Sequence, residues 1–512
     1  MPKKRKRSCG AGAYMRMLAG AKGNVATKAS KTRCPPSSSA RSGSVRMQLR
    51  TRPPRSEPLP DGLDRNFLPD FVARAAASVP RHAWHAIAKH LSKKGKGPIT
   101  ITLGTACSGS EIYLTALPFL EKELSQRLGR DIRFVHKWSC ELDPQKRQWI
   151  IDNFSPMKLF ADVRVLAEGP CHDYVSGTLT EVDVVDVLIA GTSCKDASRL
   201  NNHHTKRLSS VETASHTTGG TFQGFARLVR KFGRRCRVVF LENVTSLKDL
   251  DPKTGRSNFD GVARTMRSMG FRFISAEFSA RDVGLPVSRP RLYMAGVRCP
   301  DEAEAQGCAD NVLQSIFSGA SNVPLKSLLC SKRRGSVSLQ QAWMPEALTR
   351  GDRFVPVVEN EAKWHQLHRK AWLQIPSKVK QQEGAKIADN HWLYTLPPRS
   401  RDLLLFANCR AQMSGHKGLS ISLQISLNWV KESPATHLPT LVPNGILWLI
   451  GEGRPLLGVE ALRLQGCDPS MLPGLAPESH NSSFLMNLAG NAFCVYQFCA
   501  WFFATLAAGD LC

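Results

Sequence analysis

The sequence predicts an α/β fold: a doubly wound, mostly parallel sheet with helices on both faces. Over residues 98–299, short apolar runs rich in β-branched residues alternate with longer amphipathic stretches, as strands alternate with helices in such folds. Several runs end in a small or polar residue, and the carboxyl ends of strands are where open α/β sheets bind ligands. The sequence contains no internal repeat that would favour a repeat architecture.

The individual elements follow from local patterns. The run at 185–190, VDVLIA, is typical of a parallel strand buried on both faces. The stretch at 64–95 has helical apolar spacing and a basic end, which suits a helix C-terminus. The expected strands share an apolar, β-branched character and lie at 99–103, 133–140, 184–190, 237–241, 271–279 and 291–297. The further helices share amphipathic spacing and lie at 111–127, 144–153, 224–232 and 259–269.

The charge of the chain indicates a polyanionic partner. Among 512 residues, 70 are Lys or Arg and 42 are Asp or Glu, so the net charge is +28. Such an excess favours nucleic acid before a membrane surface. Residues 1–55 carry 15 of these basic residues and no acid, but the remainder is also basic.

Cysteine usage and hydropathy narrow the class further. The 15 cysteines form no CxxC pair, which argues against a zinc site and a disulfide framework and favours reduced thiols inside a cell. We therefore expect no metal. No apolar run approaches the length of a membrane span, and Met1 is not followed by the apolar core of a secretory signal. We expect no membrane partner.

Composition divides the chain into five segments. Residues 1–60 are rich in Lys, Arg, Ser, Gly and Pro and are expected to be a disordered basic tail. Their cluster PKKRKR is of the nuclear-import kind, with a plastid or mitochondrial transit peptide or a plain solvated tail as alternatives. A helical lead-in at 61–97 precedes the alternating segment 98–299, and residues 446–512 return to helical texture.

Residues 300–445 lose the strand–helix alternation. Basic patches at 332–334 and 399–401 lie among tryptophans there, which suits nucleic-acid contact by charge and stacking. The alternative is that the tryptophans form the core of a small domain. The tryptophans in question are Trp343, Trp364, Trp372 and Trp392.

Reactive or polar residues follow four of the expected strands. The small-residue turn CSG at 107–109 lets a ligand approach backbone N–H groups at a helix N-terminus. Glu141 stands where nucleoside-binding sheets place an acid for ribose hydroxyls. Cys194 could be a nucleophile, although a lone cysteine is more often a small buried apolar residue. Glu242 could hold a raised pKa and donate a proton, or act as a helix N-cap or ion-pair acid.

The order of these motifs resembles that of the DNA (cytosine-5)-methyltransferase family. The similarity covers about residues 99–297 and 458–506. The matching stretches, in family order, are CSG at 107–109, CELDP at 140–144, ADV at 161–163, GTSCKDAS at 191–198, LENV at 241–244, DVGLPVSRPRLYMAGVR at 282–298, EALRLQG at 460–466 and AGNAF at 489–493. Their common order makes a chance similarity improbable and implies a class I methyltransferase (Rossmann-like) sheet.

The resemblance implies a mechanism for the reactive residues. Cys194 matches the thiol that attacks C6 of cytosine and makes C5 nucleophilic. Glu242 matches the acid that hydrogen-bonds and protonates N3. Arg289 matches the arginine that stabilises the base and the active-site loop, with Arg291 supporting it. C5 would then take a methyl group from S-adenosyl-L-methionine, and elimination would release the thiol.

The resemblance also implies a cofactor site. Glu141 is expected at the cofactor ribose, Asp162 at the adenine amino group, and Asn491 at the closure of the pocket. The first motif adds three residues to the site: Cys107, Ser108 and Gly109.

The remaining segments receive roles by the same resemblance. The base must leave the duplex to reach the thiol, and residues 199–222 are expected to form a mobile loop over it. Residues 300–445 would be an inserted target-recognition region, and residues 446–512 would complete the catalytic domain of 98–299. The expected substrate is DNA, in the nucleus. Two alternatives remain: a transferase acting on tRNA cytosine, and a non-catalytic nucleic-acid-binding homologue.

Five positions depart from the family's motifs, among them Cys107, which stands where the first motif usually has an aromatic residue. Ser193 and Lys195 flank the thiol where the family has proline and glutamine, and Lys195 could lower the thiol's pKa or disturb the loop. Glu111 replaces a glycine of the first motif, and Val287 replaces a glutamine of the eighth.

Overall fold

The computed structural model describes most of the chain beyond residue 66. The described residues are 67–92, 97–107, 109–198, 211–212, 216–251, 254–330, 368–388, 396, 398–415, 418, 420–423, 436–443, 445–475 and 481–509. The chain divides into two units, Met1–Pro58 and Leu59–Cys512, and the description concerns the second. The expected basic tail, Ser108, most of the loop at 199–222, the patch at 332–334 and Trp343, Trp364 and Trp392 lie outside the described residues.

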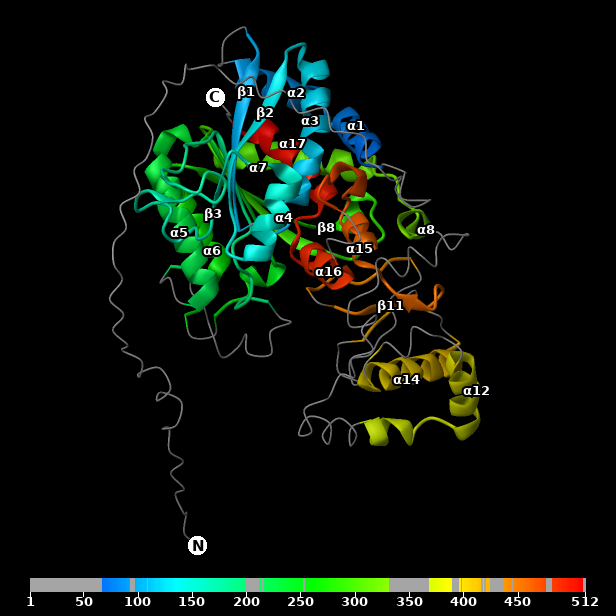
Figure 1. Ribbon diagram of the computed structural model, residues 1–512. Helices are drawn as coiled ribbons and strands as arrows, with labels where there is room; N and C mark the ends of the chain where they lie inside the picture. Colours follow the sequence, from blue (N-terminus) through cyan, green and yellow to red (C-terminus); the bar gives the residue numbers. More distant parts are fainter. Residues whose placement is uncertain are drawn as a thin grey trace, which may run out of the picture. The chain divides into compact units, whose positions relative to one another are not determined.

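A seven-stranded sheet forms the centre of the second unit (Figure 1). Its strand order is β3-β2-β1-β6-β7-β9-β8. The first five strands run parallel, whereas β9 is antiparallel to both β7 and β8. The strands span β1 Ile99–Ala106, β2 Ile132–Cys140, β3 Lys158–Phe160, β6 Val187–Ala190, β7 Val238–Asn243, β8 Arg272–Ser279 and β9 Pro290–Val297. The predicted α/β class with a mostly parallel, doubly wound sheet is confirmed.

All six predicted strands are present, with ends shifted by a few residues, and one strand of the seven-stranded sheet was not predicted. Edge strand β3 has three residues and pairs with the end of β2. Because it is so short, β3 has no readable alternation in the sequence. The helix predicted at 111–127 divides into a 3-10 turn, η1 (Ile112–Ala116), and α3 (Leu117–Leu128), which has a proline at its N-terminus.

Helices cover both faces of the sheet and enclose two apolar cores (Figure 1). One face of the sheet packs against α5 and α6. The opposite face packs against the other helices whose bounds follow. The helices span α1 Leu68–Ser78, α2 Arg81–Ser92, α4 Pro144–Phe154, α5 His216–Phe232, α6 Asn258–Ser268, α7 Glu302–Ser318 and α17 Val495–Ala508, besides α3. The three-layer arrangement buries the parallel strands on both sides, as their apolar sequences require.

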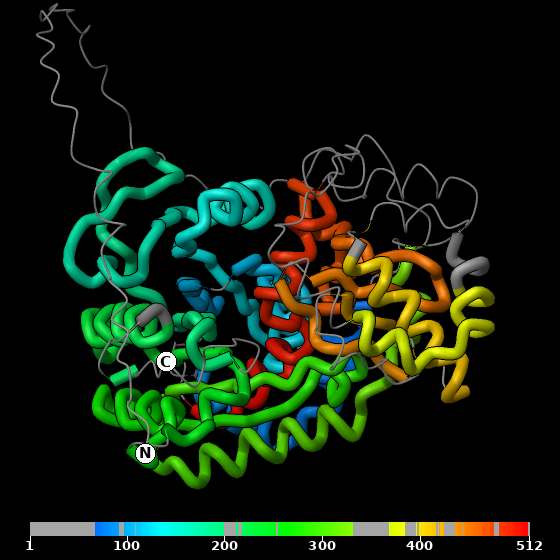
Figure 2. Tube along the Cα trace, turned by 90° about the horizontal axis from the view of Figure 1, so that it is seen from below, coloured from blue at the N-terminus to red at the C-terminus, as the bar shows by residue number. Residues whose placement is uncertain are grey.

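The C-terminal helix α17 fills the centre of one face. Every residue of α17 is buried, and its rings meet the sheet and the N-terminal helices: Phe502 stacks on Phe240, and Phe503 lies against Trp84. Figure 2 shows these red segments among blue and green ones from distant parts of the sequence. The helical stretch Ser482–Ala508 has the length and hydropathy of a membrane span, contrary to our expectation from the sequence, but 94% of its most apolar window is buried inside the protein. In this protein the stretch is part of the buried core.

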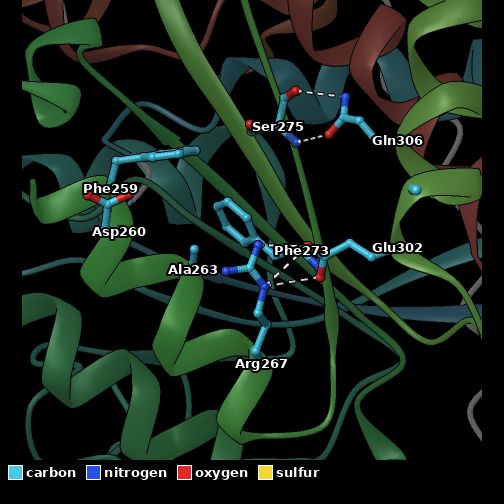
Figure 3. Close-up of a pocket in the computed structure, with 9 residues that line it drawn as sticks. Phe259, Asp260, Ala263, Arg267, Phe273, Ser275, Glu302 and Gln306 are labelled. Carbon is cyan, nitrogen blue, oxygen red and sulfur yellow. Dashed lines mark hydrogen bonds and ion pairs between the residues drawn. The ribbon is translucent and has the colours of Figure 1, made fainter.

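Helix α7 protects the free edge of the sheet at β8. Glu302 accepts a hydrogen bond from the backbone N–H of Phe273 (2.9 Å), and the Gln306 side chain bonds both the N–H and the C=O of Ser275 (2.9 and 3.0 Å). These side chains occupy backbone groups that would otherwise pair with another strand. Beside them, α6, β8 and α7 border a hollow of about 420 Å³, where Arg267 reaches across to Glu302 (Figure 3). Although α7 falls in the segment assigned to target recognition, it packs on the sheet.

Outside the seven-stranded sheet and its covering helices, the described residues form two small sheets and further helices. Trp372 donates from Nε1 to Asp402 and packs edge-on against Phe406 of α14, so this tryptophan belongs to a small helical core. The short elements are β4 Cys171–His172, β5 Leu179–Thr180, α8 Leu325–Leu328, α12 Ser377–Ala388, α14 Pro398–Ser414, β10 Ser420–Ser422, β11 Leu447–Leu449, β12 Arg454–Pro455, α15 Gly458–Leu464 and α16 Ser482–Asn491. A three-stranded sheet joins β10, β11 and β12.

Candidate active site

The carboxyl ends of the parallel strands bring the expected site residues to one edge of the sheet. Past the ends of the strands the backbone ladder continues by one step: Cys107 N–H donates to Cys140, Glu141 N–H to Phe160, and Gly191 N–H to Ala106. The cofactor and nucleophile motifs therefore leave the sheet side by side, as the fold class predicts.

A tight turn presents Cys194. The backbone N–H groups of Ala197 and Ser198 both donate to the Cys194 carbonyl (3.1 and 2.9 Å). Ser246, just after β7, fixes the turn by donating its hydroxyl to the Ala197 carbonyl (2.7 Å). A second anchor comes from α5, where the Thr218 N–H donates to the Asp196 carboxylate (2.7 Å). The turn is thus tied to two elements, which limits the positions that the thiol can take.

The neighbouring residues explain why the loop does not need the family's proline. The Ser193 N–H donates to the Thr221 hydroxyl of α5 (3.2 Å), and a proline there could not make this bond. Asn243, at the end of β7, donates its amide to the carbonyl and the hydroxyl of Thr192 (3.0 and 3.2 Å). The sequence analysis missed Thr218, Thr221 and Asn243; only Asn243, inside the LENV stretch, had a sequence signal.

Glu242 and Arg291 form a buried ion pair beside the thiol. Arg291 Nε lies 3.0 Å from Glu242 Oε1, and both side chains are little more than a tenth exposed. Oε1 has no well-directed hydrogen bond to any described residue, so the contact is ionic. Burial raises the pKa of Glu242 above its ordinary value, and the charges of Arg291 and Arg289 only partly oppose this. A carboxyl in this state can donate a proton to a ligand.

The same charged groups affect the pKa of the Cys194 thiol. Burial raises the pKa of its thiol, the Glu242 carboxylate raises it further, and Arg291 and then Arg289 lower it. The sequence suggested Lys195 for the lowering effect; the structure assigns it to the two arginines. Both ionisable groups therefore hold their protons more firmly than they would in water.

Arg289 and Arg291 have different partners, although the motif places them two residues apart. Arg289 is buried, and its guanidinium donates to the carbonyls of Leu441, Gly490 and Ala492, the last at 2.5 Å. Burial lowers its pKa to about 10. Arg289 was expected to stabilise the base; the structure directs its Nη1 and Nη2 groups to backbone carbonyls, which ties the C-terminal segment to the start of β9. Its Nε has no hydrogen-bond partner among the described residues. Arg291 is the arginine that faces the acid.

Comparison with known proteins identifies this arrangement. The family model for C-5 cytosine-specific DNA methylase matches residues 125–495. The chain belongs to the C-5 cytosine-specific DNA methylase family.

Two curated relatives of this methylase carry the same description. It is 27% identical over 409 residues to DNA (cytosine-5-)-methyltransferase DMT5 of Cryptococcus neoformans var. grubii, covering 77% of this chain and 16% of that protein. It is 22% identical over 459 residues to the DMT5 protein of Verticillium dahliae, covering 77% of this chain and 19% of that protein. The chain thus spans less than a fifth of the length of either relative. Among solved structures, S. pombe Dnmt2 methyltransferase matches 80% of this chain and 98% of its own, with 12% identity and a TM-score of 0.42.

Methylases of this family take their methyl group from S-adenosylmethionine, and the strand ends fit such a cofactor. Gly109 has φ +70°, and a Cβ there would lie 2.9 Å from the Asn491 carbonyl oxygen. The buried Ser110 hydroxyl has no hydrogen-bond partner among the described residues. Glu141 is 8% exposed and accepts the Asp143 N–H on one oxygen (2.9 Å). A glycine turn, an unsatisfied hydroxyl and an acid on the second strand suit a nucleoside ligand.

Asp162 lies close to this edge, with an intramolecular partner. Both its oxygens accept from Arg164, at 2.6–3.0 Å. The charges of Glu141, Asp162 and Arg164 all act on Cys107, whose pKa rises to about 12 mainly through burial. The four side chains therefore share one electrostatic environment. Asp162 lies where the resemblance expects the adenine, but its carboxylate is already bound by Arg164.

Proposed function

We propose that the methylase transfers a methyl group to C5 of cytosine in DNA, with Cys194 as the nucleophile and Glu242 as the acid. The observation that carries the proposal is the position of a buried carboxyl, whose pKa burial raises, beside a cysteine in a fixed turn at the carboxyl edge of the sheet. Family membership supports cytosine methylation as the reaction class.

Cys194 would act on C6 of the cytosine. A thiolate that adds to C6 forms a carbon–sulfur bond and moves electron density onto C5 and N3 of the ring. Because burial raises the pKa of the free thiol, the thiolate is a minor form until the base binds. Arg291 and Arg289 supply the positive charge that favours it.

Glu242 would act on N3. Burial raises its pKa, which favours the protonated carboxyl that could hydrogen-bond N3 as negative charge develops on the ring. Arg291 holds the carboxyl in place from β9 through an ion pair that leaves Oε1 without a directed hydrogen bond. After C5 has taken the methyl group, a base from solvent would remove the C5 proton and the carbon–sulfur bond would break to release the thiolate. N3 would return its proton to the Glu242 carboxylate, which restores the ring.

Residues of the first three strand ends would hold the cofactor. Glu141 would meet the ribose, and the turn at Gly109 and Asn491 would close over the amino-acid end of the ligand. S-Adenosylmethionine would supply an electrophilic methyl group to C5. Asp162 would reach the adenine only by exchanging Arg164 for it.

The substrate would be a base turned out of a duplex. The loop expected at 199–222 is wrong for residues 216–222, which belong to α5. The segment 300–445 would contribute target recognition. The net charge of +28 supports a nucleic-acid partner in general. The relatives named DNA methyltransferases favour DNA over tRNA, and the basic cluster at the N-terminus supports a nuclear protein.

Trapping with 5-fluorocytosine tests the proposal directly. Fluorine at C5 prevents the final elimination, so a working enzyme should form a covalent complex with fluorinated duplex DNA that depends on S-adenosylmethionine. Cys194→Ala should abolish the complex. Cys171→Ala is the matched control, because Cys171 is also a free, half-buried cysteine and should leave trapping intact.

Each result has a distinct meaning. A cofactor-dependent adduct lost only in Cys194→Ala supports the nucleophile, the base and the cofactor together. Trapping on fluorinated RNA but not on DNA would overturn the DNA substrate. No adduct on either polymer, with binding retained, would overturn the enzymatic proposal in favour of a binding protein.

A further inference from the structure

The first cofactor motif contains an acid in an unusual backbone conformation. Glu111 has φ +56° and ψ +16°, a left-handed conformation that glycine adopts readily and other residues rarely adopt. Its side chain is fully buried. A residue that accepts both backbone strain and the burial of a carboxylate needs compensating contacts.

The compensating contacts come from the ends of two neighbouring strands. Thr105 of β1 and Ser139 of β2 are direct partners in the parallel ladder, so their side chains lie on one face. Each donates its hydroxyl to a different oxygen of the Glu111 carboxylate, with 2.8 Å for Ser139. The Thr105 hydroxyl also lies 3.1 Å from that of Ser139. The carboxylate therefore spans both strand ends.

A histidine completes the cluster. His136 Nε2 lies 3.1 Å from the Ser139 hydroxyl and 3.9 Å from Glu111 Oε2. Burial lowers the pKa of His136 to about 4, so the imidazole is neutral near neutral pH. With its proton on Nε2 it can donate to the Ser139 hydroxyl oxygen, whose own proton goes to Glu111. The cluster is thus held by hydroxyl hydrogen bonds to one carboxylate.

The position of the cluster links it to the cofactor edge. Glu111 ends the turn that contains Gly109, and Ser139 lies two residues before Glu141. Gly109 and Glu141 are the two positions that fit the cofactor best. A contact that joins Glu111 to Ser139 therefore fixes the distance between the turn and the acid.

We propose that Glu111 is a positioning residue for the cofactor: its buried carboxylate clamps the first-motif turn onto the ends of β1 and β2 and so replaces the conformational freedom of glycine with a fixed contact. The proposal rests on the proposed function for the identity of the ligand. Removing the carboxylate would release the turn and separate the two halves of the cofactor site.

The test compares two substitutions to glycine at left-handed positions. Glu111→Gly removes the clamp, whereas Ser155→Gly relieves a similar backbone conformation (φ +43°) at the exposed end of α4, away from the site. Affinities for S-adenosylmethionine and S-adenosylhomocysteine are measured by calorimetry, and melting temperature is measured on the same samples. Methyl transfer, where present, gives KM for cofactor and for DNA separately.

We expect Glu111→Gly to weaken cofactor affinity at least tenfold, about 1.4 kcal/mol, and to raise KM for the cofactor while KM for DNA stays constant. Ser155→Gly should leave both constants unchanged. Glu111→Gln retains one acceptor oxygen and should fall between Glu111→Gly and the natural protein. Ser139→Ala removes one of the two bonds and should cause a smaller loss, which keeps the test usable if Glu111→Gly does not fold.

Three outcomes oppose these expectations in different ways. If Glu111→Gly melts lower but binds cofactor normally at a temperature where it is folded, the cluster is structural only and the positioning role is wrong. If Ser155→Gly weakens binding equally, the effect belongs to backbone strain and the clamp is also wrong. If the natural protein binds neither ligand, the proposed function fails before the clamp is tested.

Discussion

Replacing Arg291 with glutamine should unmask the buried charge of Glu242. The Nε of Arg291 lies 3.0 Å from Oε1 of the carboxyl, and both groups are little more than a tenth exposed. Two opposite charges about 4 Å apart attract by about 4 kcal/mol at an effective dielectric constant of about 20. Removing one partner from such a pair costs about 3–5 kcal/mol if the other remains charged.

Protonation of Glu242 limits that cost. Neutralising a carboxyl with an ordinary pKa near 4.3 costs about 3.5 kcal/mol at pH 7 and about 1 kcal/mol at pH 5. The loss of unfolding free energy in Arg291→Gln should therefore reach at most about 3.5 kcal/mol at pH 7 and shrink to about 1 kcal/mol or less at pH 5. The sign follows because a carboxyl whose pKa is raised in the folded state binds more protons there, so stability falls as pH rises.

Urea denaturation of both proteins at about pH 5 and pH 7.5 measures this difference without requiring any activity. Arg267→Gln is the matched control: its pair with Glu302 spans 2.6 Å but is 50% and 30% exposed. Arg267 holds the pKa of Glu302 below its usual value, so the control should lose at most about 1 kcal/mol, equally at both pH values. An Arg291→Gln deficit that is the same at both pH values would refute the reasoning.

Four further outcomes are expected. In the natural enzyme, kcat/KM should rise with pH through the lower pKa of the Glu242–Cys194 pair and fall through the higher pKa, because the active form holds one proton on the pair. In Glu242→Gln the residual rate should only rise with pH, as the thiol ionises. A fall in rate at high pH in this variant would contradict the roles assigned. Arg289→Met leaves several buried carbonyls without their donor, so it should lower stability by about 3 kcal/mol or more and expose the C-terminal segment to limited proteolysis; unchanged protease resistance would contradict the tie. Glu460→Leu should cost about 3–5 kcal/mol in chemical denaturation because it strands the buried Arg454 guanidinium and leaves the Cys330 and Leu457 N–H groups without their acceptor. Adding Arg454→Met should recover the part of the loss that is due to the guanidinium; additive losses would show that the pair is not coupled. DNA affinity should fall by about a hundredfold or more between about 50 and 200 mM salt, and a flat titration would argue against binding through phosphates.

The strand ends of the site were predictable because each carries its signal locally. The apolar runs that precede 107, 141, 194 and 242 indicate the edge of the sheet to which those residues belong, whatever the tertiary detail. The same reasoning failed for β3, where three residues offer no periodicity. Nor did the sequence analysis recognise that 482–508 has the length and hydropathy of a membrane span. Helix α17 is apolar on all sides because it is buried inside the protein.

The partners of individual side chains were not predictable. Arg289 meets carbonyls more than 150 positions away in sequence, and nothing local distinguishes it from Arg291. Asp162 and Arg164 are near neighbours in the sequence, but the hydrogen bond between them depends on the conformations of both side chains. Glu111 appeared in the sequence only as a missing glycine, because its partners come from two strands that the fold brings together.

Helix α17, which packs against one face of the sheet, is synthesised after every strand of that sheet. Until α17 leaves the ribosome, Phe240 and the surrounding apolar face have no cover, however much of the chain has already emerged. The described elements that precede it in the sequence, from α7 onward, are therefore synthesised before this apolar core is complete. If translation stopped anywhere before residue 495, the product would lack α17 and would expose one face of the sheet. Such a shortened chain would not be a smaller methylase, and it should be a substrate for chaperones and proteases.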